Sequence, residues 1–517
     1  MKTFFALTQR TRMPTLLVAT AVLAGCSLTP TYQRPAAPVD PAYPSGAAYV
    51  QAAFGSSGEV SAADIGWRDF FRDPLLQQLI AISLSNNRDL RKAALNVEAA
   101  RAQYRIKRAE LLPHLGAGAD GAARRVPADL GPAADATIDR SYQVSGIVSW
   151  EIDLWGRIRN LGEQALASYL ALDETRTAAQ LSLVAEVANT YLTLRADQEL
   201  LGLTQETLNA QQRSFDLTAQ LVEAGGASQI DLRRAEMSLR SAQANLAMYT
   251  RQAARDRNAL VLLLGQPLTP DLSRLLDEAV TLPDGLVPAD LPAGMPSDLL
   301  VRRPDVRAAE HQLRGANASI GAARAAFLPA ISLTGAAGTA SASLDGLFEA
   351  GSRTWSFMPR IMLPIFSGGA LKAKLDVATV RKRIQIAAYE KAIQTAFREV
   401  ADGLAGKRTL DDQIRYGRQL AAASQEAYEL ARQRFMAGVD DNLSLLDAQR
   451  TLYGAQQTLV RTRLARVSNL IDLYKALGGG WSEQTVQSAV AAMQFPGGPA
   501  HEADRTSPGA IGAASRP

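Results

Sequence analysis

An internal duplication constrains the fold of this chain more than any other feature of the sequence. The segment "DLRKAALNVEAARAQYRIKRAELLP", which starts at Asp89, aligns with "DVRAAEHQLRGANASIGAARAAFLP", which starts at Asp305. Further along, "LTAQLVEAGGASQIDLRRAEMSLRSAQANL" from Leu217 aligns with "LARQRFMAGVDDNLSLLDAQRTLYGAQQTL" from Leu430. The offset stays at about 213 to 216 residues. The chain is therefore a tandem repeat, and each element of its fold is expected twice.

Each half contains a long window without proline, in which apolar residues recur every seven positions. The two windows cover residues 133–266 and 365–495. Sustained heptads predict helices that pack side by side. We expect one helix over about 157–224 and its counterpart over about 370–437, each roughly 100 Å long at ~1.5 Å per residue. The heptad positions are Leu232, Leu239, Leu246, Ala253 and Leu260 in the first half and Leu446, Tyr453, Val460, Val467 and Tyr474 in the second.

Both long helices are expected to end in a tight turn that leads into a second helix. The turns read "EAGGASQ" and "MAGVDDN". Gly225 and Gly438 supply the positive backbone dihedral that ends a helix. Ser228, Asp441 and Asn442 are side chains that can cap the helix that follows. Each half therefore ends in a long helical hairpin.

Between the first helix and the hairpin, each half carries two stretches with alternating polarity. The clearest are residues 142–152 and 355–365, where one face is apolar and the other mostly polar. This alternation predicts strands, either between lipid and water or in an ordinary sandwich. The connecting loops are expected at about 127–140 and 345–353.

One chain does not have enough strands to close a barrel. About four amphipathic strands leave open edges, which lipid does not tolerate. Several copies must therefore pool their strands, and three copies give about twelve strands and twelve long helices. The predicted fold class is mostly α with a small membrane β part: a trimeric β-barrel with four strands per chain plus a long α-helical barrel, built from two tandem repeats.

The N-terminus has the layout of a bacterial signal peptide. A basic lead-in precedes a short apolar run, which ends in small residues before Cys26, the only cysteine of the chain. The tetrapeptide "LAGC" resembles a lipobox, which implies covalent lipid on Cys26; an ordinary signal peptide with an incidental cysteine is the alternative. Ser27 fits the outer membrane, because an Asp there favours inner-membrane retention in such lipoproteins. The prolines and small residues that follow predict an extended, poorly packed tether.

Composition excludes several classes of function. The net charge is +4 and is spread along the chain, so nucleic acid is not an expected partner. His114, His311 and His501 lie far apart, without metal-ligand spacing, and no metal or other cofactor is expected. No base accompanies a plausible nucleophile, and no phosphate loop is present, so we do not expect an enzyme.

These features divide the chain into consecutive segments. The expected order is a signal peptide, a lipid-anchored tether, the first repeat, a linker, the second repeat and a flexible C-terminal tail. Each repeat should contain a helix, two strands and a long helical hairpin. The boundaries are placed at 1–25, 26–65, 66–266, 267–296, 297–481 and 482–517.

Taken together, the motifs resemble the outer-membrane efflux lipoproteins of the OprM/NodT type, within the TolC superfamily. The resemblance covers about residues 20–481 and rests on the duplication, the lipobox, "TYQRP", "WEIDLWGRIRN", "LPIFSGGALKAKL", "AGVDDNLSLLDAQR" and "LYKALGGGW". It implies a homotrimer anchored in the lipid of the bacterial outer membrane, with a helical tunnel that extends into the periplasm. It also implies a periplasmic adaptor and an inner-membrane pump of the resistance-nodulation-division type as partners, and drugs as cargo.

The resemblance also places a gate at the periplasmic end of the tunnel. Asp447 matches the acidic ring residue, Leu443 the apolar gate residue, and Asp231 a position that ties neighbouring helices together in the closed state. Three Asp447 carboxylates brought together by threefold symmetry would attract cations. TolC has a second acid where this chain has Ser444, so a doubled acidic ring is not expected and cation block should be weaker. Both acids also fit a simpler interpretation, an acid near a helix start that the helix dipole favours.

The resemblance implies that the turns at Gly225 and Gly438 are also where the adaptor docks. Two alternatives for the whole chain remain. A duct of the same shape could serve type I protein secretion or metal-ion efflux, because nothing in the tunnel motifs identifies the cargo. A periplasmic coiled-coil adaptor or structural lipoprotein also carries heptad helices, but the paired amphipathic strands argue against it.

Overall fold

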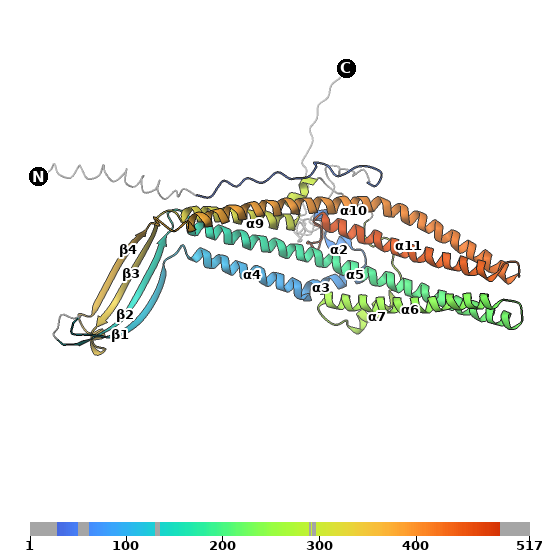
Figure 1. The fold of residues 1–517 in the computed structure, drawn as a ribbon, viewed down its shortest axis with the longest axis horizontal. Coiled ribbons are helices and arrows are strands. Elements are labelled where there is room, and N and C mark those ends of the chain that lie inside the picture. The colour runs from blue at the N-terminus through green and yellow to red at the C-terminus, as the bar shows by residue number, and fades with distance from the viewer. Residues whose placement is uncertain (1–27, 50–60, 130–134, 289–290, 292–295, 486–517) are drawn as a thin grey trace, which may run out of the picture.

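The computed structural model describes residues 28–49, 61–129, 135–288, 291 and 296–485 (Figure 1). The expected signal peptide, Cys26 and the last part of the predicted tail lie outside these residues. Within the described part of the chain, no helix combines the length and the hydropathy that crossing a membrane requires.

The elements occur in the same order in both halves, as the duplication predicts. The first half comprises η1 (Ala62–Asp64), α2 (Trp67–Phe70), α3 (Pro74–Asn86), α4 (Arg88–Ala109), β1 (His114–Val126), β2 (Thr137–Ile152), α5 (Arg157–Glu223) and α6 (Gln229–Leu264). A connection with α7 (Pro270–Glu278) and η2 (Pro296–Asp298) follows. The second half comprises α8 (Leu299–Arg302), α9 (Pro304–Ala325), β3 (Ala330–Ser341), η3 (Asp345–Phe348), β4 (Arg353–Met362), α10 (Ala370–Met436) and α11 (Asn442–Ala476).

The two long helices and their turns match the sequence prediction. Helices α5 and α10 each have 67 residues and run along most of the molecule (Figure 1). Gly225 and Gly438 follow them with φ of 76° and 69°, a conformation that costs glycine little. Ser228 caps α6 and Asp441 caps α11 through their side chains, whereas Asn442 is already the first residue of α11.

Among the described residues, four strands form one antiparallel sheet in the order β1-β2-β3-β4, so that the two halves of the chain join at β2 and β3. Residues directly opposite each other share a face of the sheet. One row is largely apolar and consists of Leu115, Val148, Gly335 and Phe357; the adjacent row on the other face consists of His114, Ser149, Thr334 and Met358. The predicted strand 355–365 is three residues too long, because Pro364 lacks an amide donor and β4 ends at Met362.

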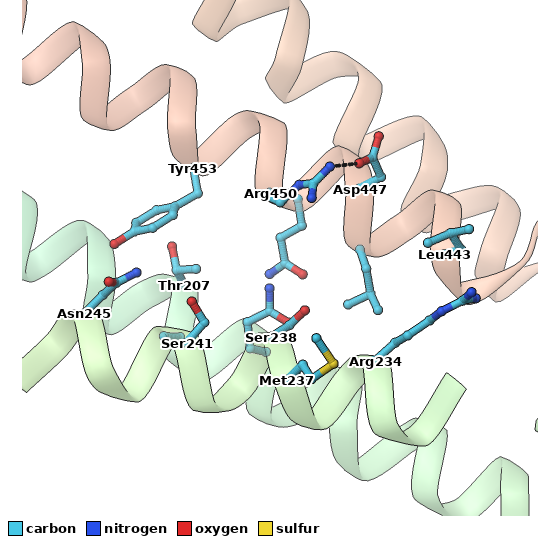
Figure 2. Close-up of a pocket in the computed structure, with 14 residues that line it drawn as sticks. Thr207, Arg234, Met237, Ser238, Ser241, Asn245, Leu443, Asp447, Arg450 and Tyr453 are labelled. Carbon is cyan, nitrogen blue, oxygen red and sulfur yellow. Dashed lines mark hydrogen bonds and ion pairs between the residues drawn. The ribbon is translucent and has the colours of Figure 1, made fainter. Parts of the chain in front are cut away.

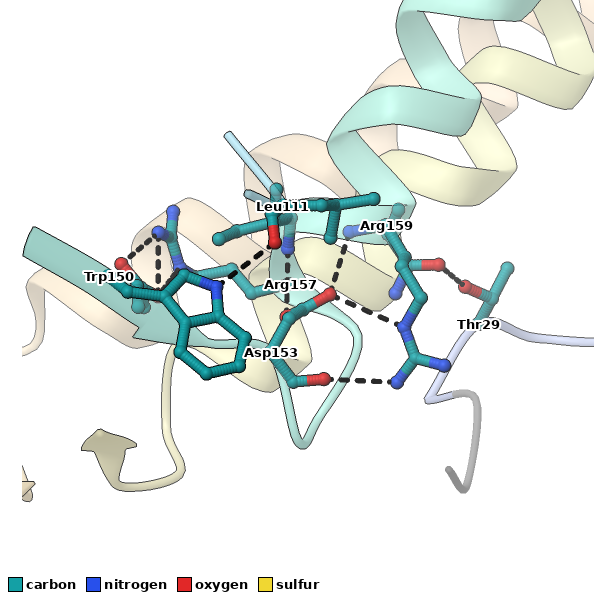
Figure 3. A network of polar contacts seen from close by, with 9 residues as sticks. Thr29, Leu111, Trp150, Asp153, Arg157 and Arg159 are labelled. Atoms are coloured by element: carbon teal, nitrogen blue, oxygen red, sulfur yellow. Dashed lines mark hydrogen bonds and ion pairs between the residues drawn. The ribbon is translucent and has the colours of Figure 1, made fainter. Parts of the chain in front are cut away.

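A cluster of polar contacts fixes the junction between the sheet and α5 (Figure 3). The Asp153 carboxylate accepts hydrogen bonds from the backbone amides of Ile158 and Arg159 at 3.0 and 2.8 Å, and so satisfies free donors in the first turn of α5. Arg157 forms an ion pair of 2.8 Å with Glu151 at the end of β2. These contacts give a structural reason for Glu151, Asp153 and Arg157 in the motif "WEIDLWGR", where the chain passes from strand to helix.

In the described part of the chain, the long helices lie side by side in a single layer with two free edges. Near the sheet, the neighbours are α4 with α5, α5 with α9 and α9 with α10. Toward the hairpin turns, the neighbours are α6 with α5, α5 with α11 and α11 with α10. One edge of the layer is therefore formed by β1, α4 and α6, and the other by β4 and α10.

The main hydrophobic core surrounds the middle of the long helices. The ring of Phe70 stacks on that of Tyr474, with centroids 3.9 Å apart. Residues 482–485 add a short backbone pairing, in which the amides of Trp67 and Arg68 donate to the carbonyls of Ser482 and Glu483. The predicted tail was therefore set to begin too early, because residues 482–485 are bonded to the core region.

The expected tether also differs from the prediction. Residues 28–49 are extended, but they pack against the helices instead of lying free. Arg34 forms an ion pair of 2.8 Å with Glu310 of α9, and the Thr29 hydroxyl donates to Asn160 at 2.7 Å. Gly321 makes room for this segment, because a Cβ atom there would collide with Thr29 and Asn160. Glu310 and the small residues of α9 thus form a binding surface that local composition did not reveal.

Candidate constriction at the hairpin turns

The turns of the two helical hairpins lie at the end of the molecule that is farthest from the sheet (Figure 1). Gly225 and Gly438 occupy these turns, and no atom of the described residues lies within 4 Å of the position that a Cβ would take at either glycine. Apolar side chains near the turns are exposed, among them Ile230, Met436 and Val439. The hairpin ends therefore present open surface next to a tight backbone turn.

Close to the turns, α5, α6 and α11 enclose a groove of about 370 Å³ (Figure 2). Leu443 and Asp447 both line it, one helical turn apart on α11, and Leu443 is 46% exposed. The structure therefore brings these two predicted gate residues to one surface. The full lining is Thr207, Gln211, Arg234, Met237, Ser238, Ser241, Ala242, Asn245, Leu443, Leu446, Asp447, Gln449, Arg450 and Tyr453.

Asp447 is paired with a basic side chain in the same groove. Arg450 donates from Nη2 to the Asp447 carboxylate at 2.6 Å, and the side chains of Arg450 and Asp447 are 82% and 58% exposed. Sequence reasoning singled out the acid and missed its partner. The spacing in "DAQR" was a usable signal, because residues three apart on a helix lie next to each other.

The third predicted gate residue, Asp231, is engaged at the start of its own helix. The Ser228 amide donates to Asp231 Oδ2 at 3.2 Å, and the Asp231 amide donates to Ser228 Oγ at 3.3 Å, which is a capping box. Arg234 lies 3.6 Å from the same carboxylate. These contacts lie within α6 and its cap, so they support the helix-start interpretation of Asp231.

Other residues tie the two hairpins together. The side-chain amide of Asn442 donates to the Thr218 hydroxyl at 3.2 Å, and both residues are almost fully buried. The hydroxyls of Thr204 and Tyr453 are 2.7 Å apart. Farther from the turns, the Tyr249 hydroxyl accepts from Gln457 and Arg461 at 3.1 and 2.9 Å. Sequence reasoning missed these contacts because they join residues more than 200 positions apart.

Two carboxyl groups meet between α5 and α6. Burial, followed by the interaction with the neighbouring carboxyl group of Asp256, raises the pKa of Asp197 to about 7. The positive charge of Arg461 opposes that shift. Burial also raises the pKa of Asp256, whose Oδ2 atom is buried without a hydrogen-bond partner among the described residues. The pair therefore shares a proton near neutral pH.

Within the described residues, no group of three or more His, Cys, Asp or Glu side chains is arranged to hold a metal ion. His114 lies at the start of β1 and His311 on α9. The features gathered at the hairpin ends are thus a groove, exposed charges and contacts between hairpins.

Comparison with known proteins identifies the family of the chain. The model of the family described as "Outer membrane efflux protein" matches residues 79–266 and 295–479. Two relatives from Pseudomonas putida, the antibiotic efflux pump outer membrane protein ArpC and the toluene efflux pump outer membrane protein TtgC, are each 48% identical over 486 residues. These alignments cover 93% of this chain and 99% of each relative.

Solved structures agree with these relatives. The crystal structure of the open state of the Neisseria gonorrhoeae MtrE outer membrane channel matches with a TM-score of 0.77 and 41% sequence identity. The match covers 89% of this chain and 100% of that one. Both comparisons confirm the predicted resemblance and the fold class, which is mostly helical with a small sheet.

Proposed function

The chain belongs to the outer membrane efflux protein family, and from this membership and the shape of the subunit we propose that three copies close into one continuous duct. The protein is the outer-membrane channel component of an efflux system. In the proposed trimer, the sheets form a barrel across the outer membrane and the helices form a tunnel into the periplasm. This role needs no catalytic chemistry.

The observation that carries the proposal is the pair of matching free edges. Within the described residues of one subunit, β1 and β4 each leave one side unpaired, and open strand edges are not tolerated in lipid. Helix α4, which is described over its whole length, contributes no buried residue, and its Leu95 and Ile106 side chains are exposed. At the opposite edge, Val380 and Ile384 of α10 are exposed as well. When the β1 and α4 edge of one copy joins the β4 and α10 edge of the next copy, both exposed edges are covered.

The faces of the sheet support the same arrangement. Leu115, Val148 and Phe357 lie on one face and suit lipid, whereas Ser149 and Thr334 lie on the other and suit a water-filled lumen. An interface between two different edges closes into a ring when the rotation from one copy to the next is a whole fraction of a full turn. With three copies, the barrel has three times four strands, that is twelve.

We assign the remaining parts from the resemblance of their motifs to this family. Leu443 and Asp447 would narrow the periplasmic entrance, where Leu443 excludes water and Asp447 contributes charge. Asp231 would hold the start of α6 in place next to this entrance. The turns at Gly225 and Gly438 would receive a periplasmic adaptor, which connects the duct to an inner-membrane pump. Lipid on Cys26 would anchor each copy to the outer membrane.

The proposed cargo is organic small molecules, because the relatives above are named for antibiotics and toluene. A duct of the same shape for type I protein secretion or metal-ion efflux is the alternative. The test is deletion of the gene, with complementation by the wild type, followed by susceptibility to a panel of antibiotics, dyes, solvents and metal salts.

We expect the deletion to increase sensitivity to antibiotics, dyes and solvents, and complementation to reverse the effect. Unchanged sensitivity to all organic compounds, together with lost secretion of a protein or increased sensitivity to metal salts alone, would overturn the proposed cargo.

A further inference from the structure

We propose that neighbouring copies join in the register of the seam between β2 and β3, which places Arg360 opposite Asp120 of the next copy. This inference rests on the proposed duct and specifies which residues of its subunits meet. It follows from the internal duplication, because each subunit already contains one seam between two repeats. That seam is the template for the seam between copies.

The first step shows that the duplication fixes the strand register. The offset from His114 to Ala330, the starts of β1 and β3, is 216 positions, and the offset between the starts of α5 and α10 is 213 positions. Strands β2 and β4 lead into these two helices and share their offset. Applied to the pair His114–Ser149 of β1 and β2, the offsets give Ala330–Met362, which is a pair of β3 and β4. Both repeats therefore pair their strands in the same register.

The second step transfers the seam between the repeats to the free edges of the sheet. In that seam, Ile147 of β2 lies opposite Ala336 of β3. The same offsets convert Ile147 into Arg360 of β4 and Ala336 into Asp120 of β1. Residues directly opposite each other in an antiparallel pair share a face of the sheet. When β4 of one copy pairs with β1 of the next in this register, Arg360 therefore faces Asp120.

The charges of the two edges support this register. Arg360 and Asp120 are both exposed, and among the described residues of one copy neither side chain forms an ion pair. Within one copy, Asp120 lies opposite Gln143 and Arg360 lies opposite Ser332, so their known cross-strand neighbours are polar and neutral. Opposite charges that face each other across two strands stabilise the pairing of those strands. Each copy thus has a base on one edge and the matching acid on the other.

The helices lead to the same neighbour. Helix α5 packs on α9 through a stripe that includes the buried residues Ala167 and Ala171, and a Cβ atom at Gly315 of α9 would lie 3.2 Å from the Cβ of Ala167. The offset of 213 positions converts these alanines into Val380 and Ile384 of α10, which are 50% and 57% exposed. The same stripe is therefore larger, fully apolar and uncovered in the second repeat.

Helix α4 carries the surface that corresponds to α9. Ala99 and Ile106 of α4 take the positions of Gly315 and Ala322, and both are exposed in one copy. The transferred contact is Val380 against Ala99 of the next copy, with Ile106 on the same face of α4. The sheet and the helices thus place the edge formed by β1 and α4 next to β4 and α10 of the neighbouring copy.

The test is disulfide crosslinking of the full-length lipoprotein in outer membranes. Cys26 is the only cysteine of the chain and carries lipid in the proposed protein, so introduced cysteines are the free thiols. Opposite Cα atoms of antiparallel strands are about 4.5 to 5.5 Å apart, which suits a disulfide. We expect Arg360→Cys combined with Asp120→Cys to give covalent dimers and trimers on oxidation. The link must join two copies, because β1 and β4 are opposite edges of one sheet (Figure 1).

Matched controls shift one cysteine by two positions on the same face. Arg360→Cys combined with Gly118→Cys or with Ala122→Cys should crosslink far less, because diagonal Cα atoms are about 7 to 8 Å apart. At the helices, Val380→Cys combined with Ala99→Cys should link two copies through a short bis-methanethiosulfonate reagent.

Charge reversal gives a second readout that does not depend on thiols. Arg360→Asp places two acids opposite each other and should lower the temperature at which trimers dissociate in SDS. Adding Asp120→Arg to the same chain should restore the wild-type temperature, because it recreates the pair in the opposite orientation.

Intact trimers that crosslink through the Gly118→Cys or Ala122→Cys pair instead would overturn the proposed register, and so would intact trimers without any crosslink between positions 360 and 120. A charge reversal without effect, or without rescue, would also count against the pair. A wild-type protein with the native mass of one chain would instead refute the proposed duct, and the inference would fall with it.

Discussion

Asn442 in the first turn of α11 donates its side-chain amide hydrogen to the hydroxyl of Thr218 on α5, across 3.2 Å and 224 positions of sequence. The same hydroxyl donates to the carbonyl of Ser214 at 2.7 Å, so its hydrogen-bonding capacity is used by both helices. Asn442 and Thr218 are 6% and 1% exposed. This contact joins the first-repeat hairpin to the second-repeat hairpin close to their turns.

Loss of this contact should favour separation of the hairpins. In Thr218→Val, the Asn442 amide stays buried without an acceptor, which costs about 1 to 3 kcal/mol in the joined state. A shift of about 1.4 kcal/mol changes an equilibrium tenfold. We therefore expect single-channel conductance, or the open fraction in bilayers, to increase several-fold.

The control for this prediction is Thr462→Val on α11, because the Thr462 hydroxyl donates to the carbonyl of Thr458 in its own helix. This variant should conduct like the wild type. An unchanged conductance for Thr218→Val, or an equal increase for both variants, would show that the Asn442–Thr218 contact does not hold the hairpins together.

The Asp197–Asp256 pair should make the stability of the folded protein depend on pH. Because the pKa of Asp197 is raised to about 7, the folded state keeps a proton that the unfolded state releases near pH ~4. Unfolding therefore becomes easier as pH rises from about 4 through about 7. We expect a loss of about 1 to 2 kcal/mol between pH 5 and pH 8, reduced from the full linkage value because both side chains partly face solvent.

Urea unfolding followed by circular dichroism at pH 5 and pH 8 measures this effect. Asp256→Asn should reduce the difference between the two midpoints, because it removes the repulsion from Asp256 while the burial of Asp197 remains. Asp216→Asn, at an α5 position where the carboxylate accepts from Gln212 in the same helix, should keep it. A urea midpoint of the wild type that is higher at pH 8 than at pH 5 would contradict the raised pKa of Asp197.

Gly321 should control how residues 28–34 attach to α9. In Gly321→Ala the new methyl group collides with the Thr29 hydroxyl and the Asn160 amide, so this end of the segment must move. We expect amides of residues 29–34 to exchange hydrogen at least about tenfold faster, as measured by mass spectrometry, since opening free energies fall when local contacts are lost.

The matched control is Gly162→Ala on α5, where no atom of the described chain lies within 4 Å of the added Cβ. This change should leave the exchange of residues 29–34 unaffected and stabilise the helix by up to ~1 kcal/mol. Equal exchange in Gly321→Ala and the wild type would mean that the segment is not held by this surface.

The repeated elements were predictable because their signals are local. Heptad spacing, the absence of proline and the glycines at 225 and 438 define α5, α6, α10 and α11 without reference to distant residues. Alternation of polar and apolar residues likewise located β2 and β4, although Pro364 ended β4 earlier than the pattern suggested. The resemblance added Leu443 and Asp447, which the structure brings to one groove.

What the sequence did not reveal depends on contacts between distant segments. The surface on α9 that holds residues 28–49 requires Glu310 and Gly321, neither of which stands out in its local context. The Asn442–Thr218 contact and the Asp197–Asp256 pair form only when α5 packs against its neighbours. Arg450 is an exception, because its partner Asp447 is only three positions away. This ion pair was therefore predictable from the sequence.

The most direct test of the closed duct is native mass spectrometry of the full-length lipoprotein, extracted in a mild detergent, combined with conductance of the same preparation in planar bilayers. If the free edges at β1 and α4 join those at β4 and α10 of the next copy, the mass should equal three lipid-modified chains, and the preparation should conduct ions through a water-filled lumen. A mass of one chain across the working concentration range, with no conductance, would contradict it.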